Sequence, residues 1–226
     1  MRFGKIMLLL IPLVLLLAGC LPQPTLRSEE FLDDVSLVTS DPCGAPCWNG
    51  ITPGETSWLE ALAILQNDAA LDGVEIETEE DFVWAHWKGV DSSLECCRMI
   101  ADSEEENVSF LFLTVSPNMI VDSVLSEYGD PDYVTTFEFT DTESVVQLVY
   151  PDLPMVISAL VDGTEGSLLA NSDVVATLYM APDVMTEIIE SNELKAWEGY
   201  QSYGAYAEAE PVITPAVTPE GEESAE

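Results

Sequence analysis

Two series of short apolar segments, separated by polar turns, constrain this chain more than any other feature. The first series occupies residues 74–77, 82–87, 94–100 and 108–115, and the second occupies 133–139, 145–150, 155–161 and 174–179. Short apolar runs bounded by polar turns are typical of β-strands. Because the turns are short, strands that follow one another should pair antiparallel. The segment 108–115 is almost entirely apolar, which favours a central position in its sheet.

Helices are expected at three places, before, between and after these series. Ser57 is followed three residues later by Glu60, which is the pattern of a capping box. Ser116-Pro117 and Pro182 each precede a stretch with apolar residues at helical spacing. Prolines 53, 117 and 182 recur at intervals of 64 and 65 residues. We therefore expect an α+β fold, with two αββββ-like units that have antiparallel sheets, plus a C-terminal helix.

The chain divides into five expected parts. They are a signal peptide (1–19), a lipidated tether (20–41), a first α+β unit (42–116), a second α+β unit with the closing helix (117–204) and a disordered acidic tail (205–226). Prolines, acids and weak periodicity indicate the tether, although the segment from Phe31 to Val38 is amphipathic enough to pack on the domain edge. The tail has little apolar surface to bury.

The N-terminus predicts where the protein resides. Arg2 and Lys5 precede an apolar run of about 13 residues, which is typical of a secretory signal and short for a membrane span. The run ends in Leu17-Ala18-Gly19-Cys20, which looks like a bacterial lipobox. We therefore expect lipidation of Cys20, and a lipid-anchored protein on the extracytoplasmic face of the cell membrane or outer membrane.

The charge restricts the partners. The chain carries 42 acidic and six basic residues, and loss of residues 1–19 would leave four basic residues and a formal charge of −38. Nucleic acid is excluded because phosphate binding requires clustered Lys and Arg. Anionic lipid headgroups would be repelled as well, so the lipid on Cys20 would have to provide the membrane link. The acidic surface fits adaptation to salt, or attraction of cations or a basic partner.

Four further cysteines are expected to form two disulfides in an oxidising compartment. They are Cys43, Cys47, Cys96 and Cys97. A bond between adjacent cysteines needs a strained ring, so bridges from the 43–47 loop to the 96–97 strand are favoured. A four-thiolate zinc site is the alternative, but the spacing fits it poorly because such sites use Cys-x2-Cys pairs.

No catalytic or cofactor signature is present. His86 is the single histidine, and no Gly-x-Ser-x-Gly motif accompanies it. Carboxylates are so frequent that a glycosidase pair cannot be picked out. The acidic runs 77–81 and 102–106 do not follow the calcium-binding loop pattern. We therefore predict a non-enzyme without metal or cofactor.

Two motifs carry a resemblance to a known family. Ile51-Thr52-Pro53-Gly54-Glu55-Thr56 at a helix entry, and Ser126-Glu127-Tyr128-Gly129-Asp130-Pro131 at a helix end, resemble turns of small outer-membrane lipoproteins of the SmpA/OmlA (BamE-like) group. Glu55 and Tyr128 stand where that group usually has Met and Leu. The tandem layout resembles β-lactamase-inhibitor proteins, and the segment from Cys47 resembles lipoproteins with a Cys-Trp-x-Gly-Ile-Thr-Pro-Gly motif. The resemblance implies a non-catalytic envelope protein that acts by binding.

The expected function is therefore a membrane-anchored module for protein interaction or envelope assembly. Its partner would be an envelope protein or a cell-wall component. The candidate contact residues are Trp48, Trp84, His86 and Trp87, because aromatic side chains often anchor partners. For Trp48, which stands beside an expected disulfide, the alternative is a packing anchor. The alternatives are a receptor for a cation or small glycan, and a hydrolase that uses His86 or a carboxylate pair.

Overall fold

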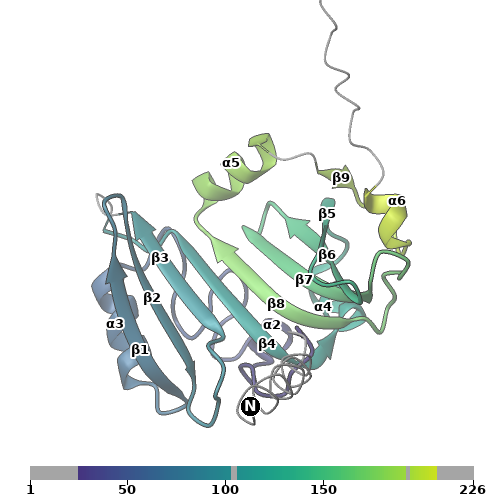
Figure 1. The fold of residues 1–226 in the computed structure, drawn as a ribbon. Helices are drawn as coiled ribbons and strands as arrows, with labels where there is room; N and C mark the ends of the chain where they lie inside the picture. The colour runs from purple at the N-terminus through teal and green to yellow at the C-terminus, as the bar shows by residue number, and fades with distance from the viewer. Residues whose placement is uncertain (1–24, 103–105, 192–193, 208–226) are drawn as a thin grey trace, which may run out of the picture.

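A single antiparallel sheet forms the body of the protein (Figure 1). The computed structural model describes residues 25–102, 106–191 and 194–207. The sheet order is β1-β2-β3-β4-β8-β7-β6-β5-β9. The strands are β1 (Leu71–Thr78), β2 (Phe82–Gly89), β3 (Cys97–Asp102), β4 (Phe110–Ile120), β5 (Tyr133–Glu138), β6 (Glu143–Tyr150), β7 (Met155–Asp162), β8 (Asp173–Met180) and β9 (Lys195–Ala196).

The prediction of two αββββ units, each with a sheet of its own, is wrong. β4 pairs with β8 from Phe110↔Met180 to Ile120↔Asp173, and this ladder joins the two strand series into one sheet. Short turns identify pairing between neighbours in sequence, but they say nothing about two strands that lie about sixty residues apart. The short helices are accessory to the sheet, so the fold is mainly β. The eight strand positions themselves are confirmed, except that 94–96 precede β3.

Short helices accompany the sheet, and five of them lie within the described residues. They are α2 (Ser36–Thr39), α3 (Trp58–Asn67), α4 (Val121–Tyr128), α5 (Pro182–Ser191) and α6 (Tyr203–Ala207). The predicted cap of α3 is confirmed, because the Ser57 side chain accepts a hydrogen bond from the Glu60 backbone N–H at 3.4 Å. Gly129 ends α4 with φ of 79°, which a glycine adopts without steric cost.

The predicted helix start at Ser116-Pro117 is wrong. Both residues lie in β4, and α4 begins only at Val121. The β4–β8 register shifts between Thr114 and Met119, so Pro117 occupies an irregular part of the strand. Such a position tolerates proline because no ladder hydrogen bond is needed from its nitrogen. The expected boundary at residues 116 and 117 therefore falls within a strand.

The predicted tether is also wrong for the part that the structure describes. Leu32 pairs with Val115 in an isolated parallel bridge and is buried, and Leu37 in α2 is 3% exposed. This bears out the expected packing of the segment from Phe31 to Val38. The expected signal peptide and lipidation site, Cys20, lie outside the described residues. The tail begins later than predicted, because Ala205–Ala207 belong to α6, and residues 208–226 lie outside the described residues.

The buried side chains form layers on both faces of the sheet. The main layer lies between one face and helices α3, α4 and α6, and it extends across both strand series. On the other face, α5 packs over Val149, Val156 and Met180. Leu26 packs over Val145, Leu160 and Val175 on that same face. Both of these smaller clusters cover the second strand series.

Candidate functional site

One face of β2 and β3 carries a group of partly exposed aromatic and charged side chains. Strand alternation turns Ala85 and Trp87 toward α3 and the main core, where both are fully buried. Phe82 and Trp84 therefore project from the opposite face, and Phe82 is 50% exposed. This face of the first strand series therefore carries partly exposed aromatic side chains.

Trp84 is covered on one side by an arginine. The guanidinium carbon of Arg98 lies 4.5 Å from the centre of the Trp84 ring. Ile100 is the direct cross-strand neighbour of Trp84, and His86 is that of Arg98. A cation over an indole at an exposed site contributes about 0.5–1 kcal/mol. Trp84 Nε1 is buried and has no hydrogen-bond partner among the described residues.

His86 lies between two carboxylates, that of Glu77 on β1 and that of Glu95 in the segment before β3. Its Nδ1 is 2.6 Å from Glu95 Oε1, and its Nε2 is 3.5 Å from Glu77 Oε1. An ionised carboxylate only accepts hydrogen bonds, so Nδ1 carries the proton of the Glu95 bond. The His86 side chain is 16% exposed, whereas the two glutamates are more than half exposed. The Glu95 carboxylate thus holds one side of the ring, while Nε2 is buried without a hydrogen-bond partner among the described residues.

Two shallow hollows flank Trp84. An apolar hollow of ≈ 200 Å³ is lined by Glu79, Phe82, Trp84 and Ile100. A polar hollow of ≈ 180 Å³ is lined by Glu77, Trp84, His86, Glu95 and Arg98. We call this region the Trp84 face, and it comprises Glu77, Phe82, Trp84, His86, Glu95, Arg98 and Ile100. It offers an apolar hollow and a hollow with charged side chains next to each other.

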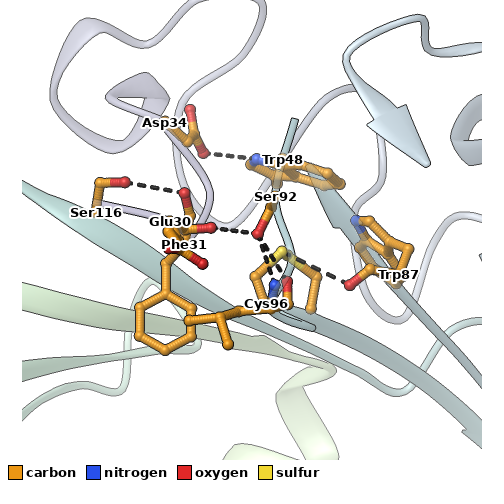
Figure 2. Close-up of a disulfide and its surroundings, with 10 residues drawn as sticks. Glu30, Phe31, Asp34, Trp48, Trp87, Ser92, Cys96 and Ser116 are labelled. Atoms are coloured by element: carbon orange, nitrogen blue, oxygen red, sulfur yellow. Dashed lines mark hydrogen bonds between the residues drawn. A yellow bond between two sulfur atoms is a disulfide. The ribbon is translucent and has the colours of Figure 1, made fainter. Parts of the chain in front are cut away.

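Two of the predicted contact residues belong to the core instead. Trp87 is fully buried and Trp48 is 5% exposed. Their rings stack with centroids 5.9 Å apart, and Trp48 Nε1 donates to Asp34 Oδ2 at 2.7 Å (Figure 2). Trp84 and Trp87 are three residues apart on one strand, so they lie on opposite faces. The prediction failed because it treated the two tryptophans as one exposed group.

The disulfide pairing also differs from the favoured prediction. Cys43 bonds to Cys47, and Cys96 bonds to its neighbour Cys97. Figure 2 shows Cys96 next to Trp87 and Ser92, on the side of the sheet where Trp48 packs. Cys96 Sγ lies 3.7 Å from the Trp87 carbonyl oxygen, and it has no proton to donate because it is part of a disulfide. The stacked tryptophans, and not a disulfide, connect the 43–47 loop to the sheet.

Sequence analysis missed the members of the Trp84 face that come from other strands. Glu77 and Arg98 join Trp84 and His86 through the β1–β2 and β2–β3 registers. Glu95 reaches His86 from the segment that precedes β3. An alternating pattern on 82–87 indicates which side chains share a face, but register depends on turn geometry. Basic residues are scarce in this chain, so a basic residue on a strand next to Trp84 could have been considered as a candidate site residue; Arg98 is such a residue.

The comparisons with known proteins add no relative. No protein-family model, no curated protein and no solved structure matches this chain. Within the described ranges, no group of three or more His, Cys, Asp or Glu side chains is placed to hold a metal ion. The same ranges contain no helix that is both long enough and apolar enough to cross a membrane.

Proposed function

We propose that this protein is a lipid-anchored, extracytoplasmic lipoprotein that binds another envelope protein through the Trp84 face and catalyses no reaction. The observation that carries the proposal is the arrangement of Trp84 under Arg98 between an apolar and a charged hollow. Tryptophan and arginine are the residue types that most often dominate the energy of protein interfaces.

The size of the hollows favours a protein partner over a small ligand. Small-molecule pockets are usually 300–1,000 Å³ and enclose most of the ligand. The two hollows beside Trp84 measure ≈ 200 and ≈ 180 Å³. Each has room for one side chain. A partner that places an apolar side chain against Phe82 and Ile100 would occupy the first hollow.

Charge favours a basic partner. The formal charge of −38 after loss of residues 1–19 would steer positively charged surfaces toward the protein and repel acidic polymers of the cell wall. Glu77 and Glu95 are more than half exposed beside the polar hollow and would meet a lysine or arginine of the partner. The proposed partner is therefore a protein with an apolar anchor next to a basic patch.

The proposed place in the cell rests on the sequence. The Leu17-Ala18-Gly19-Cys20 motif supports lipidation. The helix-entry and helix-end motifs at Ile51 and Ser126 support kinship with SmpA/OmlA lipoproteins. The glycine of the first motif, Gly54, has φ of +84°, and an added Cβ would lie 3.2 Å from Pro182. That turn therefore requires glycine.

A receptor for a small glycan is the second candidate. An indole ring close to the carboxylates of Glu77 and Glu95 has the composition of a sugar-binding surface. The position of Arg98 over the ring weighs against it, since a sugar would have to displace the guanidinium. A glycan at 100 times its dissociation constant would add about 2.7 kcal/mol to the free energy of unfolding, which a thermal-shift panel would detect.

Affinity capture from membranes tests the proposal. The lipidated protein, its Trp84→Ala and Arg98→Ala variants and a Leu59→Ala control are compared, with mass spectrometry of the captured proteins. Leu59 is 77% exposed on α3, away from the Trp84 face. We expect one stoichiometric basic envelope protein with the wild type and the control, and its loss with both variants. Equal capture by all four proteins would contradict a role for this face.

A further inference from the structure

We propose that a second membrane contact accompanies the lipid anchor: the tip of the β5–β6 hairpin, with Phe137 and Phe139, rests in the headgroup region of the bilayer. The inference rests on the proposed lipidation of Cys20. It adds a fixed orientation of the protein on the membrane, with the Trp84 face turned away from the lipid.

The first step is the fixed position of the chain close to the anchor. Thr25 Oγ1 donates to Glu143 Oε1 at 2.5 Å, and the Leu26 backbone N–H donates to Glu143 Oε2 at 2.9 Å. Arg27 Nε lies 2.8 Å from Asp173 Oδ2. Leu26 packs against the cluster that includes Val145. Residues 25–27 are thus held to the sheet by hydrogen bonds, an ion pair and apolar contact.

The second step is the short distance to the lipid. Four residues lie between Cys20 and Thr25 in the sequence, so five Cα–Cα steps connect them. A chain of that length spans at most about 18 Å in any conformation. The attachment point at Glu143 must therefore lie within roughly that distance of a lipid on Cys20. The end of the sheet that holds Glu143 has to face the bilayer.

The third step is the apolar surface at this end. Phe137 is 43% exposed and Phe139 is 38% exposed. Phe137 is the direct cross-strand neighbour of Val145, against whose cluster Leu26 packs. The Phe139 backbone N–H donates to the carbonyl of Glu143, the residue that holds Thr25. The two phenylalanines therefore lie next to the point where the chain leaves for the membrane.

A further apolar side chain lies on the other flank of this segment. Ile120 is 37% exposed and is the cross-strand neighbour of Asp173, which binds Arg27. Direct cross-strand neighbours share a face, so Ile120 projects on the side where Arg27 lies. Apolar side chains thus flank residues 25–27 on both sides. Aromatic and aliphatic side chains at such a position gain free energy by entering the interfacial layer.

The register then places the Trp84 face at the far end of the sheet. Asp173 begins β8, and Met180 ends it beside Phe110. The ladder continues from Phe110 to Ile100 and from Ile100 to Trp84. The eight residues of β8 span about 24 Å, so the binding surface lies about one strand length from the anchored end. A partner would reach it from the aqueous side.

The acidic character of the hairpin defines the membrane surface that it fits. Glu138 lies between the two phenylalanines in the sequence, Asp141 follows two residues after Phe139, and both carboxylates would be repelled by anionic headgroups. We therefore assign the contact to a zwitterionic lipid surface and use phosphatidylcholine vesicles as the probe.

Hydrogen exchange on the reconstituted protein tests the inference. The lipidated chain on phosphatidylcholine vesicles is compared with residues 20–226 that carry Cys20→Ser and remain in solution. We expect amide exchange at 137–143 to slow severalfold on vesicles, while exchange at the β1–β2 turn (residues 79–81) stays the same. A Phe137→Ser, Phe139→Ser double variant should remain on the vesicles and lose the protection. Anionic phosphatidylglycerol in the vesicles should reduce the protection.

Vesicle flotation and the mass of the N-terminal peptide distinguish a failure of the hairpin contact from a failure of the lipid anchor. A lipidated, floating protein whose hairpin exchanges as fast as in solution would overturn the hairpin contact and leave the anchor intact. A protein that carries no lipid on Cys20 would overturn both. Equal protection of the hairpin and of the β1–β2 turn would overturn the proposed orientation.

Discussion

The two strand series of this sheet have strands of similar length, but they differ in how far each is covered. β7, in the second series, is buried at every position from Met155 to Val161. β1, in the first series, has no fully buried position. In the second series, α5 and Leu26 cover the face that the main core does not. In the first series the corresponding face carries Trp84 and Arg98 and is open to solvent.

This difference assigns different tasks to the two series. A strand that is buried on both faces contributes stability along its whole length, and it has no surface left for a partner. A strand that is buried on one face leaves every second side chain available. The first series therefore carries the proposed binding surface, and the second series carries the scaffold and the proposed membrane contact.

The largest expected effect comes from two tryptophans on the same strand. We expect Trp87→Ala to lower the free energy of unfolding by about 3–5 kcal/mol, because the side chain is fully buried in the main core. Trp84→Ala should cost about 1 kcal/mol, which is the order of its contact with Arg98. Urea denaturation of both variants measures the two values. Equal costs would show that the first series is covered on both faces.

A matched pair of residues on β7 should give two large losses of stability instead of one large and one small loss. Ile157 and Leu160 are also three residues apart, and they belong to buried clusters on opposite faces. We expect Ile157→Ala and Leu160→Ala each to lower the free energy of unfolding by about 2–5 kcal/mol. The same denaturation experiment applies. If only one of the two substitutions lowered the free energy of unfolding, the second series would be covered on one face only, as the first series is.

Alkaline pH should destabilise the fold through two buried tyrosines of the second series. Burial raises the pKa of Tyr179 and of Tyr150 well above the usual range, with further contributions from Tyr128 and Asp34 for Tyr179, and from Asp130 and Tyr200 for Tyr150. The unfolded chain then loses these protons at a lower pH than the folded chain. Stability should be complete below about pH 10 and fall as pH rises further.

Two spectroscopic probes separate the series in that experiment. All seven tyrosines follow β4 in the sequence, whereas four of the five tryptophans precede it. Since β4 and β8 join all strands into one sheet, tyrosine absorbance at high pH and tryptophan fluorescence should change together. A Tyr179→Phe variant should shift both transitions to higher pH. A tryptophan fluorescence transition at the same pH in the wild type and in Tyr179→Phe would contradict a role of this buried phenol in alkaline unfolding.

The disulfides have a smaller expected effect, and their pairing is directly testable. Trypsin cleaves after Lys88 and Arg98, so it separates residues 28–88, with Cys43 and Cys47, from residues 89–98, with Cys96 and Cys97. Because each pair closes on itself, we expect two separate peptides without reductant. Reduction should cost about 1–2 kcal/mol per bridge, since the closed loops are very short. A single cross-linked species would contradict the pairing.

The sequence predicted local structure well and long-range structure poorly. The strand positions and the Ser57 cap follow from side-chain alternation and capping chemistry, which depend on nearby residues. The β4–β8 pairing depends on residues about sixty positions apart, and no local pattern reports it. Pro117 was read as a helix start because its role in an irregular strand depends on β8. The tether was read from composition, whereas Leu32 and Glu143 hold that segment to the sheet.

The candidate site was predicted in part for the same reason. Trp84 and His86 lie on the open face, as proposed, because strand alternation carries that information. Trp48 and Trp87 were assigned to the surface because they are aromatic, although Trp87 lies an odd number of residues from Trp84 and so faces the core. The place of Arg98 beside Trp84 depends on the β2–β3 register, and that of Glu95 beside His86 depends on the segment that precedes β3, so no local pattern reports either position.

Site-specific photocross-linking in living cells tests the central claim most directly. A photoreactive amino acid is placed at Phe82, within the Trp84 face, and in a separate strain at Leu59, on the outer side of α3. The account predicts that the probe at Phe82 captures one basic envelope protein and that the probe at Leu59 does not. Capture of the same protein from both positions, or capture from Leu59 alone, would contradict a binding surface on the open face of the first strand series.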